Sequence, residues 1–276
     1  MNNVKEIFQT DKHIDKSSIY MFGIRIDNLT KVKAIKIIRE FINNRFEQSP
    51  RKIFFVNVHT IHLARRNQNF LSIVNNSDLA LPDGSGLKIA GKIFSKPIKE
   101  NLNGTDLTPA LLELAEQEGW KVYLLGAGQN IVSNCVSKLH SLFPKLKIAG
   151  FHSGYFSNQE LPIILEKINE SSPEILLVAM GSPIQEEFIN NHLKNINSSV
   201  CIAVGGLFDF LSGDKKRAPI IIRKIGMEWL YRFANDPKSK WERIFIEIPV
   251  FLTLVLIKKF LPNSIISTIN RKFSFR

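Results

Sequence analysis

Asp83 is the first residue in this sequence whose type and position suggest chemistry. It stands in the segment Leu-Pro-Asp-Gly at 81–84, directly after a short apolar stretch. A carboxylate at the end of a strand can act as a general base, because it can take a proton from a group that is about to react. Pro-Asp-Gly is also common in ordinary turns. The pattern by itself favours the turn.

Three glycine segments follow apolar stretches in the same way. Gly-Ala-Gly at 126–128, Gly-Ser-Pro at 181–183 and Gly-Gly at 205–206 each separate a predicted strand from a predicted helix. Backbone N–H groups at such junctions can approach a phosphate, and a helix N-terminus favours an anion. Ile131 stands where the third glycine of a dinucleotide fingerprint would be. The segment 126–128 therefore fits a nucleotide site and a plain tight turn about equally well.

Polar side chains extend this candidate site. Ser182 can cap a helix that Pro183 begins, and Glu186 suits the first turn of that helix because of the helix dipole. This capping leaves Gln185 free to contact a sugar or a phosphate. The candidate nucleotide-binding residues are then Gly126, Gly128, Gly181, Ser182, Gly205, Gly206 and Asp209.

The net charge of +12 is concentrated at the C-terminal end. Residues 215–276 contain 14 Lys and Arg but 4 Asp and Glu, so the rest of the chain is nearly neutral. Such a segment predicts an anionic partner, which could be nucleic acid, a phosphorylated substrate or a membrane surface. The basic run 215–217 could reach a diphosphate, although such runs are more often solvated loops. Arg232, Lys240 and Arg243 could form one basic face.

The same segment has the composition of a membrane-interface region. Its uncharged run at 248–257 would extend about 15 Å as a helix, half of a hydrocarbon core of roughly 30 Å. It could lie in one leaflet but could not cross the bilayer. Trp229, Tyr231 and Trp241 suit that interface. The alternative is a terminal helix packed on the body of the protein.

Other kinds of chemistry have little support in the sequence. There is no Asp-x-Asp pair and no Gly-x-Ser-x-Gly, and His59 and His62 lack a Glu in a zinc-helix spacing. We therefore expect neither a metal nor a cofactor. Cys135 and Cys201 stand in apolar patterns, which indicates reduced thiols in the cytoplasm. The polar N-terminus predicts no signal peptide.

Strands and helices alternate along most of the chain. Apolar runs predict strands at 20–26, 52–56, 79–81, 121–125, 146–149, 175–180 and 200–204. Periodicity and capping predict helices at 29–46, 60–67, from about 86, 108–118, 130–142, 159–168 and 185–193. Such alternation predicts an α/β fold with a parallel sheet covered on both faces and ligands beyond the carboxyl ends of its strands. We expect a loose arm at 1–17, an α/β domain at 18–214 and a basic C-terminal appendage at 215–276.

Six segments, taken together, resemble the bacterial WecG/TagA/CpsF glycosyltransferase family. They are FFVNVHT at 54–60, LPDG at 81–84, NGTDL at 103–107, AMGSPIQEEF at 179–188, AVGGLFDFLSGDKKRAP at 203–219 and GMEWLYRFANDP at 226–237. The resemblance implies a Rossmann-like fold and inverting transfer of a sugar from a UDP donor to a lipid-linked sugar. In the best-known branch, N-acetylmannosamine is added to undecaprenyl-diphosphate-N-acetylglucosamine. The resemblance also implies a C-terminal appendage that docks on the membrane.

The resemblance assigns roles to individual residues. Asp83 matches the proposed base, and Asn57 and Gln185 match residues that contact the sugar. Thr105 and Asp106 stand beside the expected sugar site, as does Asn101, where several members have Arg. Phe55 replaces a Thr that many members have. The basic residues at the positions expected to meet the lipid diphosphate are Arg217, Arg232, Lys240 and Arg243.

The resulting expectation is a metal-independent transferase on the inner face of the cell membrane, making cell-surface polysaccharide or teichoic acid. A nucleotide-sugar epimerase or dehydrogenase is an alternative, but it would need a full dinucleotide fingerprint. A nucleic-acid-binding module fits the basic segment but not the apolar run inside it, so no nucleic-acid partner is expected. A non-catalytic membrane scaffold and a homo-oligomer both stay open.

Overall fold

The computed structural model describes residues 18–45 and 49–260. The predicted arm at 1–17 therefore lies outside the described residues. Residues 261–276 of the predicted C-terminal appendage lie outside them as well.

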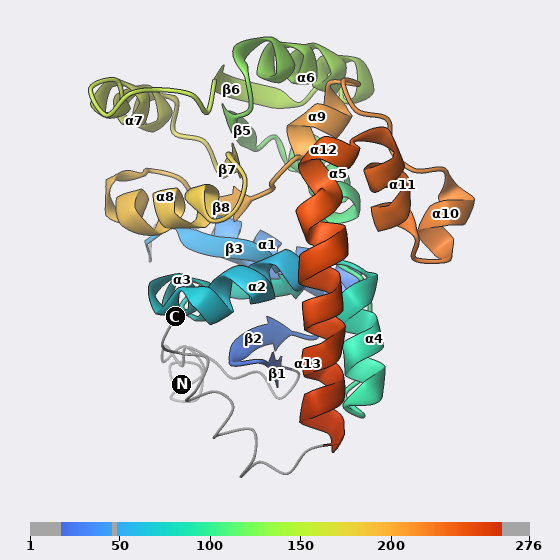
Figure 1. Ribbon diagram of the computed structural model, residues 1–276. Helices are drawn as coiled ribbons and strands as arrows, with labels where there is room; N and C mark the ends of the chain where they lie inside the picture. Colours follow the sequence, from blue (N-terminus) through green and yellow to red (C-terminus); the bar gives the residue numbers. More distant parts are fainter. Residues whose placement is uncertain (1–17, 46–48, 261–276) are drawn as a thin grey trace, which may run out of the picture.

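A six-stranded parallel sheet forms the centre of the structure (Figure 1), which confirms the predicted α/β class. Its strands lie in the order β4-β3-β8-β7-β5-β6, and each neighbouring pair is parallel. They are β3 (Arg51–Val56), β4 (Leu79–Pro82), β5 (Lys121–Gly126), β6 (Lys147–His152), β7 (Ile175–Ala179) and β8 (Val200–Ala203). Parallel strands place all their carboxyl ends at one edge, so the loops that follow them are neighbours.

Helices cover both faces of the sheet because successive strand residues point to opposite sides. Ile53 and Phe55 pack in one apolar cluster with α1 (Lys31–Asn43), α5 (Gly104–Glu118), α6 (Gln129–Leu142) and α9 (Leu207–Leu211). Phe54 packs in another with α3 (Gln68–Asn75), α7 (Leu161–Ser171) and α8 (Ile184–His192). Burial on both sides explains why these strands are continuous apolar runs in the sequence.

The strand predicted at 20–26 is wrong, because the segment forms a hairpin. β1 (Ser18–Met21) pairs antiparallel with β2 (Ile24–Asp27). Phe22 and Gly23 both have positive φ, at 53° and 84°, which is the geometry of a tight two-residue hairpin turn. The hairpin packs with α2 (Val58–Arg66) and α4 (Ser85–Ile93) in a third apolar cluster.

The helix predicted to open at Thr108 and Pro109 begins earlier, at Gly104, so Pro109 lies inside α5. A proline has no N–H to donate to the carbonyl four residues before it, which here belongs to Thr105. The Arg217 guanidinium donates to that carbonyl oxygen through Nη1 at 3.1 Å. The proline thus leaves an acceptor on α5 that a distant arginine uses.

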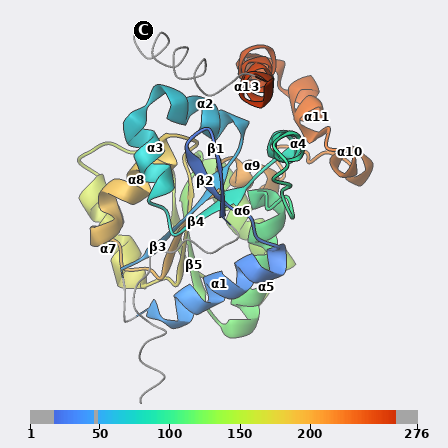
Figure 2. The same ribbon diagram turned by 90° about the horizontal axis from the view of Figure 1, so that it is seen from below.

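The C-terminal residues form a series of helices along one side of the body. They are α10 (Ile220–Lys224), α11 (Glu228–Asn235), α12 (Pro237–Glu242), a π-helical turn (Arg243–Glu247) and α13 (Ile248–Phe260). Phe251 and Val255 of α13 are buried in the cluster that contains the hairpin, α2 and α4. In Figure 2, α13 stands at the periphery of the molecule, beside α4. Among residues 18–45 and 49–260, no helix is long and apolar enough to cross a membrane.

Candidate active site

The loops after five strands meet at the carboxyl edge of the sheet. Asp83 follows β4 and Asn57 follows the adjacent strand β3. The glycine segments follow β8, β7 and β5, which are the next strands in order. The topology therefore brings the residues predicted from separate parts of the sequence to one edge.

The turn that carries Asp83 is fixed by backbone hydrogen bonds. The Asp83 N–H donates to the Val56 carbonyl at 2.7 Å, and the Leu102 N–H donates to the Pro82 carbonyl at 2.8 Å. The Gly84 N–H donates to Asn101 Oδ1 at 2.6 Å. Gly84 has a φ of 100°, a conformation that favours glycine. Asn101 therefore supports the turn, and the turn holds Asp83, a half-buried residue, at the sheet edge.

Asn57 connects Asp83 to the C-terminal helices. It caps α2, since its Oδ1 accepts from the Thr60 N–H at 3.0 Å. The same oxygen accepts from Arg243 Nη2 at 3.1 Å, while Asn57 Nδ2 donates to Asp83 Oδ2 at 3.2 Å. These donors, together with the Thr60 hydroxyl at 3.3 Å, fix the amide oxygen and leave the amide nitrogen directed at the carboxylate. Asn57 therefore holds Asp83 in one orientation.

The charge state of Asp83 reflects opposing influences. Burial raises the pKa of its carboxyl group, and the Arg232 charge, the Asn57 hydrogen bond and the Arg243 charge lower it. Burial dominates, so the pKa lies above its ordinary value. A carboxylate with a raised pKa is a stronger proton acceptor than an ordinary aspartate.

Two arginines from the C-terminal helices lie near Asp83. Arg232 of α11 donates through Nε to Glu228 Oε1 at 3.2 Å, and its guanidinium lies 4.8 Å from the centre of the Phe210 ring. Arg243 belongs to the π-helical turn and bonds to Asn57. Both positive charges lower the Asp83 pKa. Lys240 lies in α12, and the structure does not describe its side chain.

A second polar pair, His59 and Glu247, adjoins this group. His59 Nδ1 lies 2.7 Å from Glu247 Oε1, and Arg243 Nε lies 3.9 Å from Glu247 Oε2. Burial would raise the pKa of Glu247, but the hydrogen bond and charge of His59 and the charge of Arg243 lower it below its ordinary value. In the sequence, His59 was tested as a zinc ligand and lacked the required spacing, and no pattern singled out Glu247. The two are 188 positions apart, and no motif marks the pair.

Gln185 is buried between the loops after β7 and β8. Its Oε1 accepts from the Gly205 N–H at 2.9 Å, and its Nε2 donates to Glu186 Oε1 at 2.9 Å. Gln185 therefore has protein partners here, unlike the free side chain that the capping pattern predicted. The predicted Ser182 cap is also wrong, because Pro183 is the N-cap residue and Ser182 Oγ donates to the Glu186 side chain at 2.7 Å. Burial raises the pKa of Glu186.

Asp106 and Arg217 are partners of each other. Arg217 Nη2 lies 2.7 Å from Asp106 Oδ1, and Arg223 Nη1 lies 3.6 Å from the same oxygen. Burial would raise the Asp106 pKa, but hydrogen bonds from Asn103 and Arg217 lower it below its ordinary value. Thr105 donates through Oγ1 to Asn103 Oδ1 at 2.7 Å. This group attaches the chain after α9 to the first turn of α5.

The glycines at the edge have different surroundings. A Cβ on Gly126 would lie 2.4 Å from the Ala179 carbonyl oxygen, so this glycine permits β5 and β7 to approach closely. Gly128, Gly181 and Gly205 would place a Cβ in open space. Near Gly206, Asp209 pairs with Lys215 at 3.2 Å. The open glycines leave backbone that a ligand could approach.

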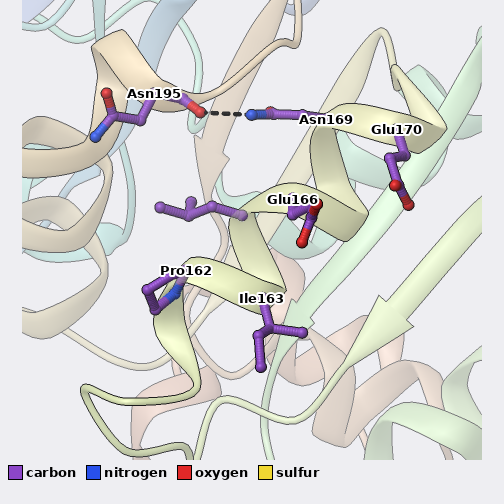
Figure 3. Close-up of a pocket in the computed structure, with 7 residues that line it drawn as sticks. Pro162, Ile163, Glu166, Asn169, Glu170 and Asn195 are labelled. Atoms are coloured by element: carbon purple, nitrogen blue, oxygen red, sulfur yellow. Dashed lines mark hydrogen bonds between the residues drawn. The ribbon is translucent and has the colours of Figure 1, made fainter.

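Figure 3 shows a surface hollow elsewhere on the molecule. It is lined by Pro162, Ile163, Leu165, Glu166, Asn169, Glu170 and Asn195. Asn169 and Asn195 stand shortly before β7 and β8, and Asn169 Nδ2 donates to the Asn195 carbonyl at 2.8 Å. The hollow therefore extends toward the amino ends of the strands, whereas Asp83 lies at the carboxyl edge.

The edge residues as a group can support acid–base chemistry on an anionic substrate. Asp83 can accept a proton, and the positive charges of Arg232 and Arg243 can stabilise negative charge. Across residues 18–45 and 49–260, His, Cys, Asp and Glu side chains form no group of three that could hold a metal ion.

Comparison with known proteins gives a consistent result. A sequence model described as "Glycosyl transferase WecG/TagA/CpsF family" matches residues 19–264. A relative from Bacillus spizizenii is 33% identical over 193 residues, which is 70% of this chain and 74% of the relative. A relative from Staphylococcus aureus strain MW2 is 30% identical over 246 residues, covering 88% and 93%. Both are named N-acetylglucosaminyldiphosphoundecaprenol N-acetyl-beta-D-mannosaminyltransferase.

Proposed function

The chain belongs to the WecG/TagA/CpsF glycosyl transferase family, and on this premise we propose that it adds an amino sugar to a lipid-linked sugar. The proposed donor is UDP-N-acetylmannosamine or UDP carrying a related hexose derivative. The proposed acceptor is N-acetylglucosamine on undecaprenyl diphosphate, and the product serves teichoic acid or other cell-surface polysaccharide synthesis. The names of the two relatives support the acceptor and the transferred sugar.

Asp83 is the proposed general base in a single displacement. Its carboxylate takes the proton of the acceptor hydroxyl as that oxygen forms a bond to the anomeric carbon of the donor. The bond from that carbon to the UDP oxygen breaks, and UDP leaves with the electron pair. One displacement inverts the configuration at the anomeric carbon. Asn57 and Gln185 are the proposed sugar contacts, with Asn101, Thr105 and Asp106 nearby.

The site must also stabilise the negative charge of two diphosphate groups, one in UDP and one in the lipid acceptor. UDP is proposed to bind along the glycine segments, whose open positions at Gly128, Gly181 and Gly205 support this assignment. The residues proposed to bind the lipid diphosphate are Arg217, Arg232, Lys240 and Arg243. Metal independence is part of the proposal, and loss of turnover on chelation with EDTA would contradict it.

The observation that supports the base assignment most directly is the Asp83–Asn57–Arg243 chain. It joins a carboxylate of raised pKa to a guanidinium through one amide, at 3.2 Å and 3.1 Å. A carboxylate that had turn formation as its whole role would not need this contact with a helix 160 residues away.

UDP release from a panel of UDP-sugars tests the proposal, with a short-chain lipid-diphosphate-N-acetylglucosamine as acceptor. Wild type should release UDP when acceptor is present, and the most active donor identifies the sugar. Asp83→Asn keeps the side-chain volume but removes the base, so its rate should fall by roughly 100-fold or more. UDP release that does not depend on acceptor would contradict transfer to the lipid-linked sugar. Full activity in Asp83→Asn would contradict the assignment of Asp83 as the base.

The C-terminal region 215–276 is proposed to act as a membrane-docking appendage to the α/β domain at 18–214. Its net positive charge and its exposed apolar side chains support peripheral binding to the inner leaflet, where the lipid acceptor is found. This placement needs neither a nucleic-acid partner nor a homo-oligomer.

A further inference from the structure

Glu247 is a buried charge in an apolar segment. Between Arg243 and Lys258 the sequence has one charged residue, Glu247, and it is 4% exposed. Removing a carboxylate from water is costly unless its partners compensate. Within the described part of the chain, its Oε2 atom has no hydrogen-bond partner. An apolar side chain would pack in this buried position without the cost of burying a charge, so packing of the π-helical turn does not explain the carboxylate.

The partners of Glu247 point toward the proposed base. Its Oε1 atom contacts His59, and its Oε2 atom lies 3.9 Å from Arg243 Nε. His59 stands in the first turn of α2, two residues after Asn57, the cap of the same helix. The π-helical turn therefore contacts the start of α2 at two points, through Arg243 on Asn57 and through Glu247 on His59.

We propose that Glu247, anchored by His59, is a positioning residue that sets Arg243 over the Asn57–Asp83 pair. Arg243 donates to Asn57 through Nη2, which is its one hydrogen bond to another side chain among the described residues. One such bond leaves a guanidinium free to rotate about it. The carboxylate on its Nε side and the anchored first turn of α2 remove that freedom. π-helical turns within α-helices are rare and occur frequently at functional sites. Here the turn carries both contacting residues, Arg243 and Glu247.

This inference rests on the proposed function, because its readout is the transfer reaction. The test uses the full-length protein with the substitution Glu247→Gln, which keeps the side-chain shape and removes the charge. The matched control is Glu242→Gln, the same change at an exposed glutamate that ends α12, five positions earlier. Both variants are compared with wild type in kcat, donor KM and Tm.

A small displacement of a catalytic group can lower a rate by up to about 100-fold. We expect Glu247→Gln to lower kcat by roughly 10-fold to 100-fold, with donor KM changed by less than about twofold. The control should keep the wild-type kcat. An unchanged kcat in Glu247→Gln would overturn the proposal.

A double-mutant cycle separates positioning from stability. If Glu247 acts through Arg243, then Glu247→Gln should cost less than about twofold when added to Arg243→Gln, because the residue it positions is already gone. His59→Gln should resemble Glu247→Gln in kcat. Full additivity of the rate losses, or a kcat loss that disappears when assays are run well below the Tm of the variant, would assign Glu247 a structural role. Absence of acceptor-dependent UDP release in wild type would instead contradict the proposed function.

Discussion

At the scale of single residues, burial and nearby charge act on Asp83 in opposite directions. Burial raises its pKa, and the Arg232 charge is the largest of the influences that lower it. A general base must be deprotonated, so kcat/KM should fall as the pH decreases through that pKa. The fall should occur at a higher pH than for an ordinary aspartate, because the pKa is raised.

Removing the Arg232 charge should shift the pH at which kcat/KM falls on the acidic side, called here the acidic limb. Arg232→Gln eliminates an influence that lowers the Asp83 pKa, so the pKa rises further and the limb shifts to higher pH. The measurement is kcat/KM against pH for both proteins. Arg223→Gln is the control, since its guanidinium lies against Asp106. A limb that stays in place in Arg232→Gln, or that moves equally in the control, would show that Asp83 is not the titrating base.

Residues in loops after strands could be predicted from the sequence, because an apolar run followed by a polar residue identifies both the strand end and the side chain beyond it. Asp83 was predicted in this way and by the family resemblance, whereas Asn57 was predicted by the resemblance alone. Glu247 was not, because its proposed role depends on the contact of the π-helical turn with the start of α2. The prediction that Gln185 is free was wrong for the same reason, because its partner Gly205 lies in the loop after a different strand, β8. Pairings between distant segments leave no local pattern.

At the scale of elements, strands and most helices were predictable because buried parallel strands are short apolar runs between turn residues. The wrong predictions of element boundaries fall at residues whose type is compatible with more than one local structure. Phe22 and Gly23 read as part of a strand but form the hairpin turn. Pro109 is typical of a helix start, yet it lies inside α5, where Arg217 donates to the Thr105 carbonyl that the proline leaves without its helical partner.

The contact between β5 and β7 gives a prediction at this scale. Gly126→Ala would place a Cβ 2.4 Å from the Ala179 carbonyl oxygen, at a φ of 148° that disfavours side chains. We expect a loss of about 1–3 kcal/mol in the free energy of unfolding, seen as a lower Tm in thermal unfolding. The backbone of both strands would have to move to avoid this loss.

Gly128→Ala is the matched control for this substitution. Gly128 has a φ of −76°, and a Cβ there would meet nothing within 4 Å. Its Tm should therefore equal that of wild type. If UDP lies along this loop, the added methyl group should weaken UDP binding measured by calorimetry. Equal losses of Tm in the two variants would contradict the conclusion that Gly126 has no room for a side chain and that Gly128 does.

At the scale of the whole molecule, exposed aliphatic side chains gather on the C-terminal helices. Ile221 and Ile225 are 75% and 63% exposed, and Trp241 and Phe245 are also exposed. The region from 215 onward also carries most of the net positive charge. Apolar side chains among cations suit a surface of anionic lipids. The proposed membrane docking therefore predicts salt-sensitive binding to anionic vesicles.

The aliphatic part of this surface can be tested by the double substitution Ile221→Asn and Ile225→Asn. Full burial of one isoleucine contributes about 1.5–3 kcal/mol, so the double variant should bind anionic vesicles at least about tenfold more weakly in co-sedimentation. Val32→Asn is the control, because Val32 is 79% exposed on α1, far from α10 in Figure 2. Tm should stay unchanged in both proteins, since the replaced side chains face solvent. Wild-type binding that persists in 1 M salt, or equal binding by the double variant, would contradict docking through α10 and its cations.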